Sequence, residues 1–247
     1  MDATRKIRNA VAAVSLLRQA VDANPALEAG AMEIKRLQSR RFAGTYADLL
    51  DHEAYRDAAT FFLEELYSDK DYAGRDAHFS RVAGAIERMF PSQVVETAVA
   101  MAELHSLTEE LDQAMALAWI EHADESLSQP RRYILAWREV GRRVERDQQL
   151  AAVLAIGRQM IRLTRTPGLR MLLKMMRGPA AAAGLGSLQG FLEAGFDTFG
   201  AMSGRSAGAA EFLSTIEARE AELLRRLFDA DLVACETELA ATLGQAL

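Results

Sequence analysis

The chain of 247 residues has little cysteine, little proline and few aromatic side chains: one Cys, five Pro, and 7% Phe, Trp and Tyr. A single cysteine excludes a scaffold held together by disulfides. Five prolines and 16 glycines are too few for a collagen-like or linker-like chain. The sequence also has no stretch of about 18 residues without charged or strongly polar groups, which argues against a membrane-spanning helix.

Hydrophobic residues make up 50% of the chain and charged residues 26%, a balance that excludes a disordered protein. The length is sufficient to bury a large core. A net charge of -6 provides no general attraction to nucleic acid. The N-terminus lacks the apolar segment of a signal peptide, so we expect a cytoplasmic protein in which Cys235 is a free, packed thiol.

Apolar residues recur at spacings of three and four along the whole chain and almost never alternate, which indicates helices and no convincing strand. Ile7, Val11 and Val14, for example, form one stripe of a helix predicted over residues 3–23. Asn24-Pro25 predicts the start of the next helix, because Asn caps a helix and Pro suits its first position.

The break at Gly44-Thr45 predicts that this second helix ends near Phe42 and that Thr45 caps a short helix. If the helix over 131–165 is interrupted, we expect the bend near Arg146 to Gln149. The pattern predicts an all-α fold, a single multi-helix bundle of about nine to ten helices over residues 1–247, with a weak possible boundary near 126–130. The later helices are predicted over residues 53–67, 75–90, 92–126, 131–165, 168–177, 180–202, 206–228 and 231–245.

The long helix over 92–126 carries the first candidate site. His105, Glu109 and Asp112 line one flank of this helix, and His122 returns to its core-facing stripe. This grouping is compatible with ligand binding or acid–base chemistry. It is equally compatible with packed histidines supported by neighbouring carboxylates. The spacing contains neither Glu-x-x-His nor His-Glu-x-x-His, so no metal site is predicted.

A basic segment is the second candidate site, since residues 131–177 hold 12 basic and 3 acidic side chains. Arg138, Arg142 and Arg146 belong to an arginine face on the helix that starts at residue 131, and further arginines at 158, 162 and 165 continue at helical spacing. The face suits an anionic ligand or an acidic protein surface. It also suits pairing with the chain's own acidic flanks. No aromatic residues interleave with the arginines, which does not favour nucleic acid.

Two apolar features indicate close contacts between helices. Gly186, Gly190, Gly195 and Gly200 recur within an apolar helix, where each glycine costs about 1 kcal/mol relative to alanine unless backbones approach closely. We expect close packing there within the chain; a dimer interface and an apolar-ligand groove remain alternatives. The preceding segment is rich in methionine and leucine and forms an adaptable apolar surface: Met171, Leu172, Leu173, Met175 and Met176.

The run Phe61-Phe62-Leu63-Glu64-Glu65-Leu66-Tyr67, together with Arg40-Arg41-Phe42 and Thr45-Tyr46-Ala47-Asp48-Leu49-Leu50, resembles a family of uncharacterised bacterial proteins named after the motif FFLEELY. The resemblance is strongest over the N-terminal 130 residues and implies no activity and no catalytic residue. A second, looser resemblance links the helix around Ala102 to Leu107 to the haem-facing part of a globin. That resemblance implies His105 as the proximal ligand of a haem iron.

No nucleophile motif such as Gly-x-Ser-x-Gly occurs, and Cys235 has no histidine near it in the sequence. We therefore expect a non-enzymatic cytosolic helical protein without a cofactor that acts through contacts with itself or with another protein. The alternative is a helical pocket for a small molecule or haem that uses His105 or His122. A third hypothesis is anion binding by the arginine face.

Overall fold

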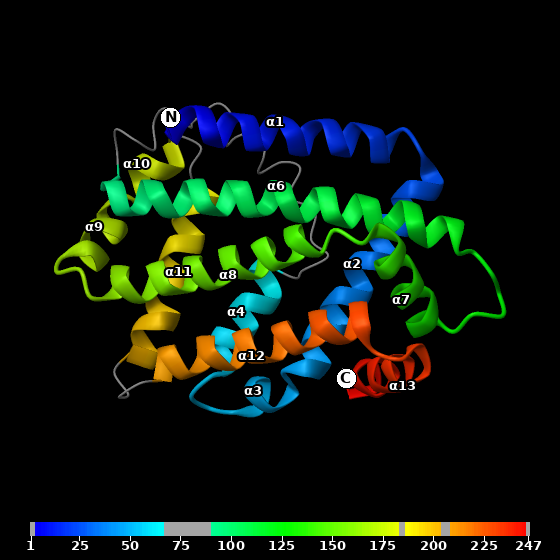
Figure 1. Ribbon diagram of the computed structural model, residues 1–247. Coiled ribbons are helices and arrows are strands. Elements are labelled where there is room, and N and C mark those ends of the chain that lie inside the picture. The colour runs from blue at the N-terminus through cyan, green and yellow to red at the C-terminus, as the bar shows by residue number, and fades with distance from the viewer. Residues whose placement is uncertain (1–2, 67–89, 183–185, 204–207, 246–247) are drawn as a thin grey trace. The chain divides into compact units, whose positions relative to one another are not determined.

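The computed structural model describes residues 3–66, 90–182, 186–203 and 208–245, and all regular structure in these residues is α-helical (Figure 1). The predicted all-α fold is confirmed, with twelve helices in the described residues. The first six are α1 (Ala3–Asp22), α2 (Pro25–Thr45), α3 (Ala47–Asp51), α4 (Arg56–Leu66), α6 (Ser92–Glu121) and α7 (Gln129–Val140). The others are α8 (Arg143–Thr164), α9 (Leu169–Met175), α10 (Arg177–Ala182), α11 (Gly186–Ser203), α12 (Gly208–Asp229) and α13 (Leu232–Gln245).

The chain divides into two compact units, each assembled from three separate stretches of sequence. Residues 126–130, where the sequence suggested a weak boundary, lie inside unit 2, and a single domain stays a prediction. Unit 1 takes its described residues from Met1–Leu16, Lys70–Leu107 and Ala151–Ser214, and unit 2 from Leu17–Asp69, Thr108–Leu150 and Thr215–Leu247.

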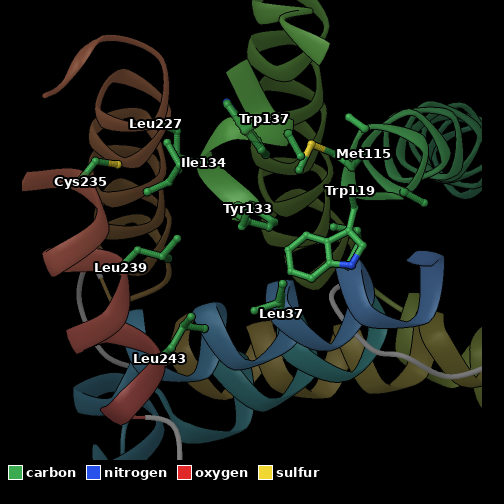
Figure 2. Close-up of a cluster of buried hydrophobic side chains, with 14 of the residues drawn as sticks. Leu37, Met115, Trp119, Tyr133, Ile134, Trp137, Leu227, Cys235, Leu239 and Leu243 are labelled. Atoms are coloured by element: carbon green, nitrogen blue, oxygen red, sulfur yellow. The ribbon is translucent and has the colours of Figure 1, made fainter. Parts of the chain in front are cut away.

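Unit 2 has a core of aliphatic and aromatic side chains contributed by α2, α6, α7, α12 and α13 (Figure 2). Trp137 lies between two other aromatic rings of this core, those of Tyr133 and Phe228. Cys235 is buried in the same core as a free thiol, as predicted. Each of these helices has an apolar stripe in which residues recur at spacings of three and four. The stripes pack against one another because burying apolar area is the main favourable term in folding.

Unit 1 has its own buried side chains, contributed by α1, α6, α8, α9, α11 and α12. The predicted stripe of α1 is confirmed, since Ile7, Val11 and Val14 are all buried. The contacts of α9 and α10 with α11 hold these two short helices in place. Phe191, Phe196 and Phe199 are the buried aromatic side chains of α11.

The start of α2 follows local sequence rules. The Asn24 side chain accepts hydrogen bonds from the backbone N–H groups of Ala26 and Leu27, and Pro25 is the first helical residue, as predicted. The expected end of α2 near Phe42 is wrong, because the helix runs on through Thr45. The Thr45 hydroxyl donates to the carbonyl of Arg41 (2.8 Å) and caps nothing.

The expected bend near Arg146 to Gln149 is also wrong. The interruption lies four residues earlier, where Gly141 (φ 68°) and Arg142 (φ 40°) both adopt positive φ and separate α7 from α8. Positive φ ends a right-handed helix and is a position that favours glycine. The helix expected over residues 75–90 lies outside the described residues, apart from its last residue.

The close helix packing expected at the glycines of α11 is wrong at Gly186, Gly190 and Gly200. A Cβ atom added at Gly186 or Gly190 would meet nothing within 4 Å, and one at Gly200 would make an ordinary contact with Thr164. The tight helix contacts lie elsewhere. A Cβ at Gly44 of α2 would collide with the backbone carbonyl of Thr242 on α13.

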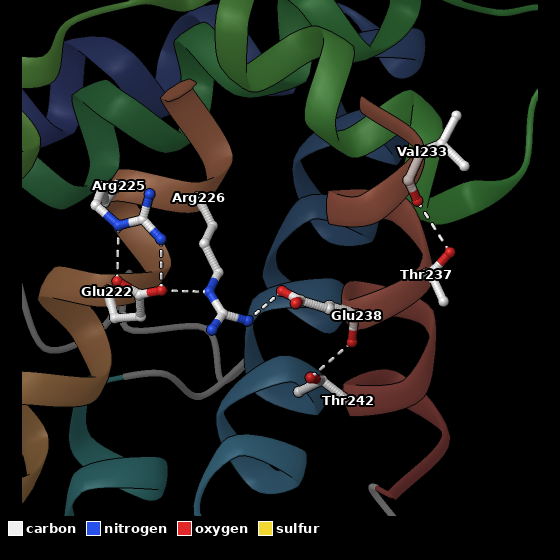
Figure 3. Close-up of polar contacts among 7 residues, drawn as sticks. All are labelled: Glu222, Arg225, Arg226, Val233, Thr237, Glu238 and Thr242. Carbon is white, nitrogen blue, oxygen red and sulfur yellow. Dashed lines mark hydrogen bonds and ion pairs between the residues drawn. The ribbon is translucent and has the colours of Figure 1, made fainter. Parts of the chain in front are cut away.

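Polar contacts reinforce the packing of α12 and α13 at the surface of unit 2 (Figure 3). Arg226 bridges Glu222 of its own helix and Glu238 of α13. Two hydrogen bonds from Arg225 and one from Arg226 hold the pKa of the Glu222 carboxyl at about 2. These four side chains are 39–57% exposed, so their contacts add charge complementarity more than stability.

Candidate functional site

The four candidate residues of the long helix do not form one group in the structure. His105 is half-buried in unit 1, whereas Glu109, Asp112 and His122 belong to unit 2. Each of the unit 2 residues has a partner on another helix. Glu109 accepts a hydrogen bond from Lys35 Nζ of α2 (2.8 Å), and Asp112 accepts one from Gln38 Nε2 (2.9 Å).

Asp112 is the most deeply buried carboxyl of this group, with 3% of its surface exposed. Burial raises the pKa of the Asp112 carboxyl above its usual value, because the charged form loses its hydration. The positive charges of Arg146 and Lys35 and the hydrogen bond from Gln38 act against this rise. Asp112 is therefore a carboxyl that holds a proton more readily than an exposed aspartate.

Arg146 of α8, chosen from the sequence as part of the anion-binding face, lies inside unit 2 beside this carboxyl. Its guanidinium stacks on the Trp137 ring at 4.2 Å from the centroid, and it donates to Gln149 Oε1 (3.1 Å). Gln149 in turn donates to the Thr108 hydroxyl of α6 (2.8 Å). Two residues selected for different reasons, Asp112 and Arg146, thus belong to one buried polar cluster.

A buried ion pair, which the sequence did not reveal, completes the cluster. Arg41 of α2 and Glu220 of α12 are both buried and lie 2.5 Å apart, and the Tyr46 hydroxyl donates to the same carboxylate oxygen (2.8 Å). Nothing in the spacing distinguishes Glu220 from the other acidic residues of α12. The one available signal was Arg41, which stands in the apolar stripe of α2 beside Phe42.

Tyr133 of α7 is influenced by the charges of both parts of the cluster. Burial raises the pKa of its hydroxyl, while the charges of Arg146 and Arg41 and a hydrogen bond with Gln38 lower it. The cluster therefore contains two guanidinium groups, two buried carboxyl groups and two phenols, those of Tyr46 and Tyr133. We name these residues the polar core of unit 2: Gln38, Arg41, Tyr46, Asp112, Tyr133, Arg146 and Glu220.

The arginine face of α7 and the start of α8 is directed at partners within unit 2. Arg138 binds carbonyl oxygens near the end of α12, and Arg142 pairs with Glu110 of α6 (2.7 Å). Anion binding by Arg138, Arg142 and Arg146 stays a prediction that would require displacing these partners. The other partners are Glu236 for Arg131, the Trp119 carbonyl for Arg132, Glu145 for Arg142 and Asp229 for Arg143.

His122 lies at the end of α6, where its Nε2 atom is 2.6 Å from Glu139 Oε2 of α7. Its side chain is partly exposed, which differs from the core-facing position expected for it. The neighbouring Glu121 carboxyl hydrogen-bonds to Glu139, and this contact raises the pKa of Glu121. Within the part of the chain that the structure describes, no group of three His, Cys, Asp or Glu side chains could hold a metal ion.

The guanidinium and carboxyl groups of the polar core come from four helices, α2, α6, α8 and α12. Arg41 and Glu220 neutralise each other directly, which requires α2 and α12 to pack in register. Breaking one partner of a buried pair is costly, since the other is left without compensation. We infer that the polar core positions helices. Haem binding at His105 stays a prediction.

The raised pKa of Asp112 leads to a prediction about stability and pH. A carboxyl whose pKa is raised by folding contributes stability below its unfolded pKa and loses it as pH rises through the folded pKa. Asp112→Asn keeps the acceptor for Gln38 and removes the buried charge. We expect this variant to be more stable than the wild type at pH 8, with the gain shrinking toward pH 4.

Urea unfolding at several pH values measures this difference, and Asp48→Asn is a control of opposite sign. Hydrogen bonds from Arg219 lower the pKa of Asp48, so its contribution is present at neutral pH and lost as pH falls through the folded pKa. We expect Asp48→Asn to lower stability at pH 8 and to have no effect in acid. A pH-independent loss in Asp112→Asn would contradict the prediction.

Comparison with known proteins identifies the family of the chain but assigns it no activity. Among the described residues, no helix is long and apolar enough to cross a membrane. No curated protein and no solved structure matches the chain. The family described as Domain of unknown function (DUF8198) matches residues 17–233, which includes all of unit 2 except its C-terminal residues. This agrees with the expected membership in a family without an assigned function: the chain belongs to the DUF8198 family.

Proposed function

We propose that the protein acts through contacts between copies of itself, and that an exposed methionine pair on α9 forms the contact. Met171 and Met175 are 69% and 70% exposed, and their spacing of four residues places them on one face of the helix. Leu169 and Leu173 are buried and anchor the opposite face. This exposed pair on an anchored helix is the observation that carries the proposal.

Methionine suits this role because its flexible thioether side chain adapts to the surface of a partner. Leu172 and Met176 are half-buried beside the pair and extend the apolar surface. A stable dimer buries about 800 Å² per partner, more than two methionine side chains provide. We therefore expect a weak, concentration-dependent dimer.

The polar core of unit 2 supports a binding protein more than an enzyme. Its two guanidinium groups and two carboxyl groups lie in one buried cluster. Arg41 pairs with Glu220, and the charge of Arg146 acts on Asp112. An active site usually leaves at least one such group poised for a substrate. The self-association proposed here needs no catalytic group.

Multi-angle light scattering over a range of protein concentrations tests the proposal. We expect the mass of the wild type to rise from monomer toward dimer, and the double variant Met171→Asp/Met175→Asp to remain monomeric. Met32→Asp is the control, since Met32 is an exposed methionine (48%) of α2 in unit 2. A wild type that stays monomeric at the highest concentration would remove the proposal.

A further inference from the structure

A long stretch of the chain carries positive charge without any acidic residue. Residues 148–192 contain no Asp or Glu, and their basic side chains are Arg158, Arg162, Arg165, Arg170, Lys174 and Arg177. Two of these six are neutralised from α11, where Asp197 pairs with Arg170 and Glu193 with Arg177. The surroundings of Arg158, Arg162 and Arg165, at the end of α8, differ from those of Arg170 and Arg177.

The side chains of Arg158, Arg162 and Arg165 are exposed, and none of these three guanidinium groups makes an ion pair or a hydrogen bond with another described residue. The arginines earlier in the sequence differ from these three, since every arginine from 131 to 146 has a partner within unit 2. Among the described residues, the guanidinium groups of Arg158, Arg162 and Arg165 have no such partner.

The three arginines form a row at the end of α8. Arg158 and Arg162 are four residues apart, so they share one face of the helix, and Arg165 is the first residue after Thr164, where α8 ends. The opposite face of α8 is anchored in unit 1 by Ile156 and Met160, which are buried. The backbone that carries the row is thus held in place, and each guanidinium group can bind a carboxylate through two parallel hydrogen bonds.

We propose that this row, which we call the α8 arginine row, binds an acidic segment of a partner protein, with carboxylates repeating along one helical face. The proposal concerns residues other than the methionine pair and goes beyond self-association. Charge complementarity carries it: three cations without a partner among the described residues, spaced four and three residues apart, match Asp or Glu at positions i, i+4 and i+7 of a partner helix.

The surroundings of the row favour a protein over nucleic acid or a membrane. The part of α8 in unit 1 contains no aromatic side chain on which a base could stack. The neighbouring residues on the exposed side include Ala151 and Ala155, which offer no large apolar group to enter a lipid layer.

Fluorescence anisotropy tests the proposal with a labelled helical peptide that carries Glu at i, i+4 and i+7, and with its Gln counterpart. We expect the full-length protein to bind the Glu peptide at low salt and to bind the Gln peptide about tenfold less tightly or worse. Arg158→Glu/Arg162→Glu should weaken binding by about tenfold or more. Raising the salt from roughly 0.05 to 0.5 M should also weaken it, since screening acts on exposed charges.

The control variant is Arg5→Glu/Arg8→Glu, which changes the net charge equally at two exposed arginines of α1, also in unit 1. We expect this control to retain most of the affinity. Equal loss in both variants, no binding of the Glu peptide, or tighter binding of an oligonucleotide or of anionic vesicles would overturn the proposal. None of these results bears on the light-scattering test of the methionine pair.

Discussion

Gly44→Ala should destabilise unit 2 and loosen α13, because the new Cβ atom has no space. It would lie 2.9 Å from the carbonyl carbon of Thr242 and closer still to the carbonyl oxygen, so the backbones of α2 and α13 must move apart. A flexible side chain could rotate away from such a contact, but a helix backbone cannot. We expect a loss of about 3 kcal/mol in the free energy of unfolding, at the upper end for overpacking.

Cys235 provides a second measurement of the same change. This thiol is buried on α13 and unreactive when the helix is docked, since burial also raises its pKa. In Gly44→Ala we expect faster modification of Cys235 by a thiol reagent under native conditions. Gly190→Ala is the control, because Gly190 is exposed with no atom near its Cβ position; it should stabilise by about 1 kcal/mol. Equal behaviour of the two variants would refute the close approach of α2 and α13.

Arg41→Met should also cause a large loss of stability, because it leaves the Glu220 carboxylate buried without its cation. Both side chains are less than a tenth exposed, and the hydrogen bond from Tyr46 is a weaker compensation than a guanidinium. Removing one member of such a pair typically costs about 3–5 kcal/mol. Urea denaturation at neutral pH measures the effect.

The double variant Arg41→Met/Glu220→Leu separates the pair from the packing of its members. With both charges gone, we expect more than half of the lost stability to return, which a double-mutant cycle expresses as a coupling energy. Arg225→Met is the matched control on α12, where the arginine pairs with Glu222 at the surface and both side chains are more than a third exposed. We expect a much smaller loss there. A double variant no more stable than Arg41→Met would show that the pair itself contributes little.

Local rules predicted the helices of this chain well. The repeat of apolar residues at three and four determines which face of a helix is buried, and it identified α1 and its stripe of Ile7, Val11 and Val14. Asn24 and Pro25 placed the start of α2 within one residue. Such features depend on neighbouring residues alone, so the sequence displays them directly. The same rules missed the break at Gly141 and Arg142, because the apolar spacing continues across the break through Val140 and Val144.

The polar core shows where sequence reasoning stopped. Asp112 and Arg146 were both selected from the sequence, but as members of two different sites. Their proximity depends on how α6 and α8 pack, and the Arg41–Glu220 pair joins residues 179 positions apart. Helical spacing rules relate residues only a few positions apart, so they cannot predict a contact between residues this far apart in the sequence. The arginines of this region were likewise interpreted as one surface. In the structure, those before Gln149 have partners, whereas Arg158, Arg162 and Arg165 have none among the described residues.

The amino-acid order alone sufficed for the all-helical class and for most helix positions, because hydrogen bonds and apolar repeats within a helix are local. Packing determined which glycines are crowded, which arginines keep a partner and which carboxyl is buried. Gly44 and Gly190 illustrate the difference, since both stand inside helices and only the first faces another backbone. Burial and charge pairing are properties of what surrounds a residue, and the surroundings of Gly44, Asp112 and Arg158 exist only once the helices have assembled.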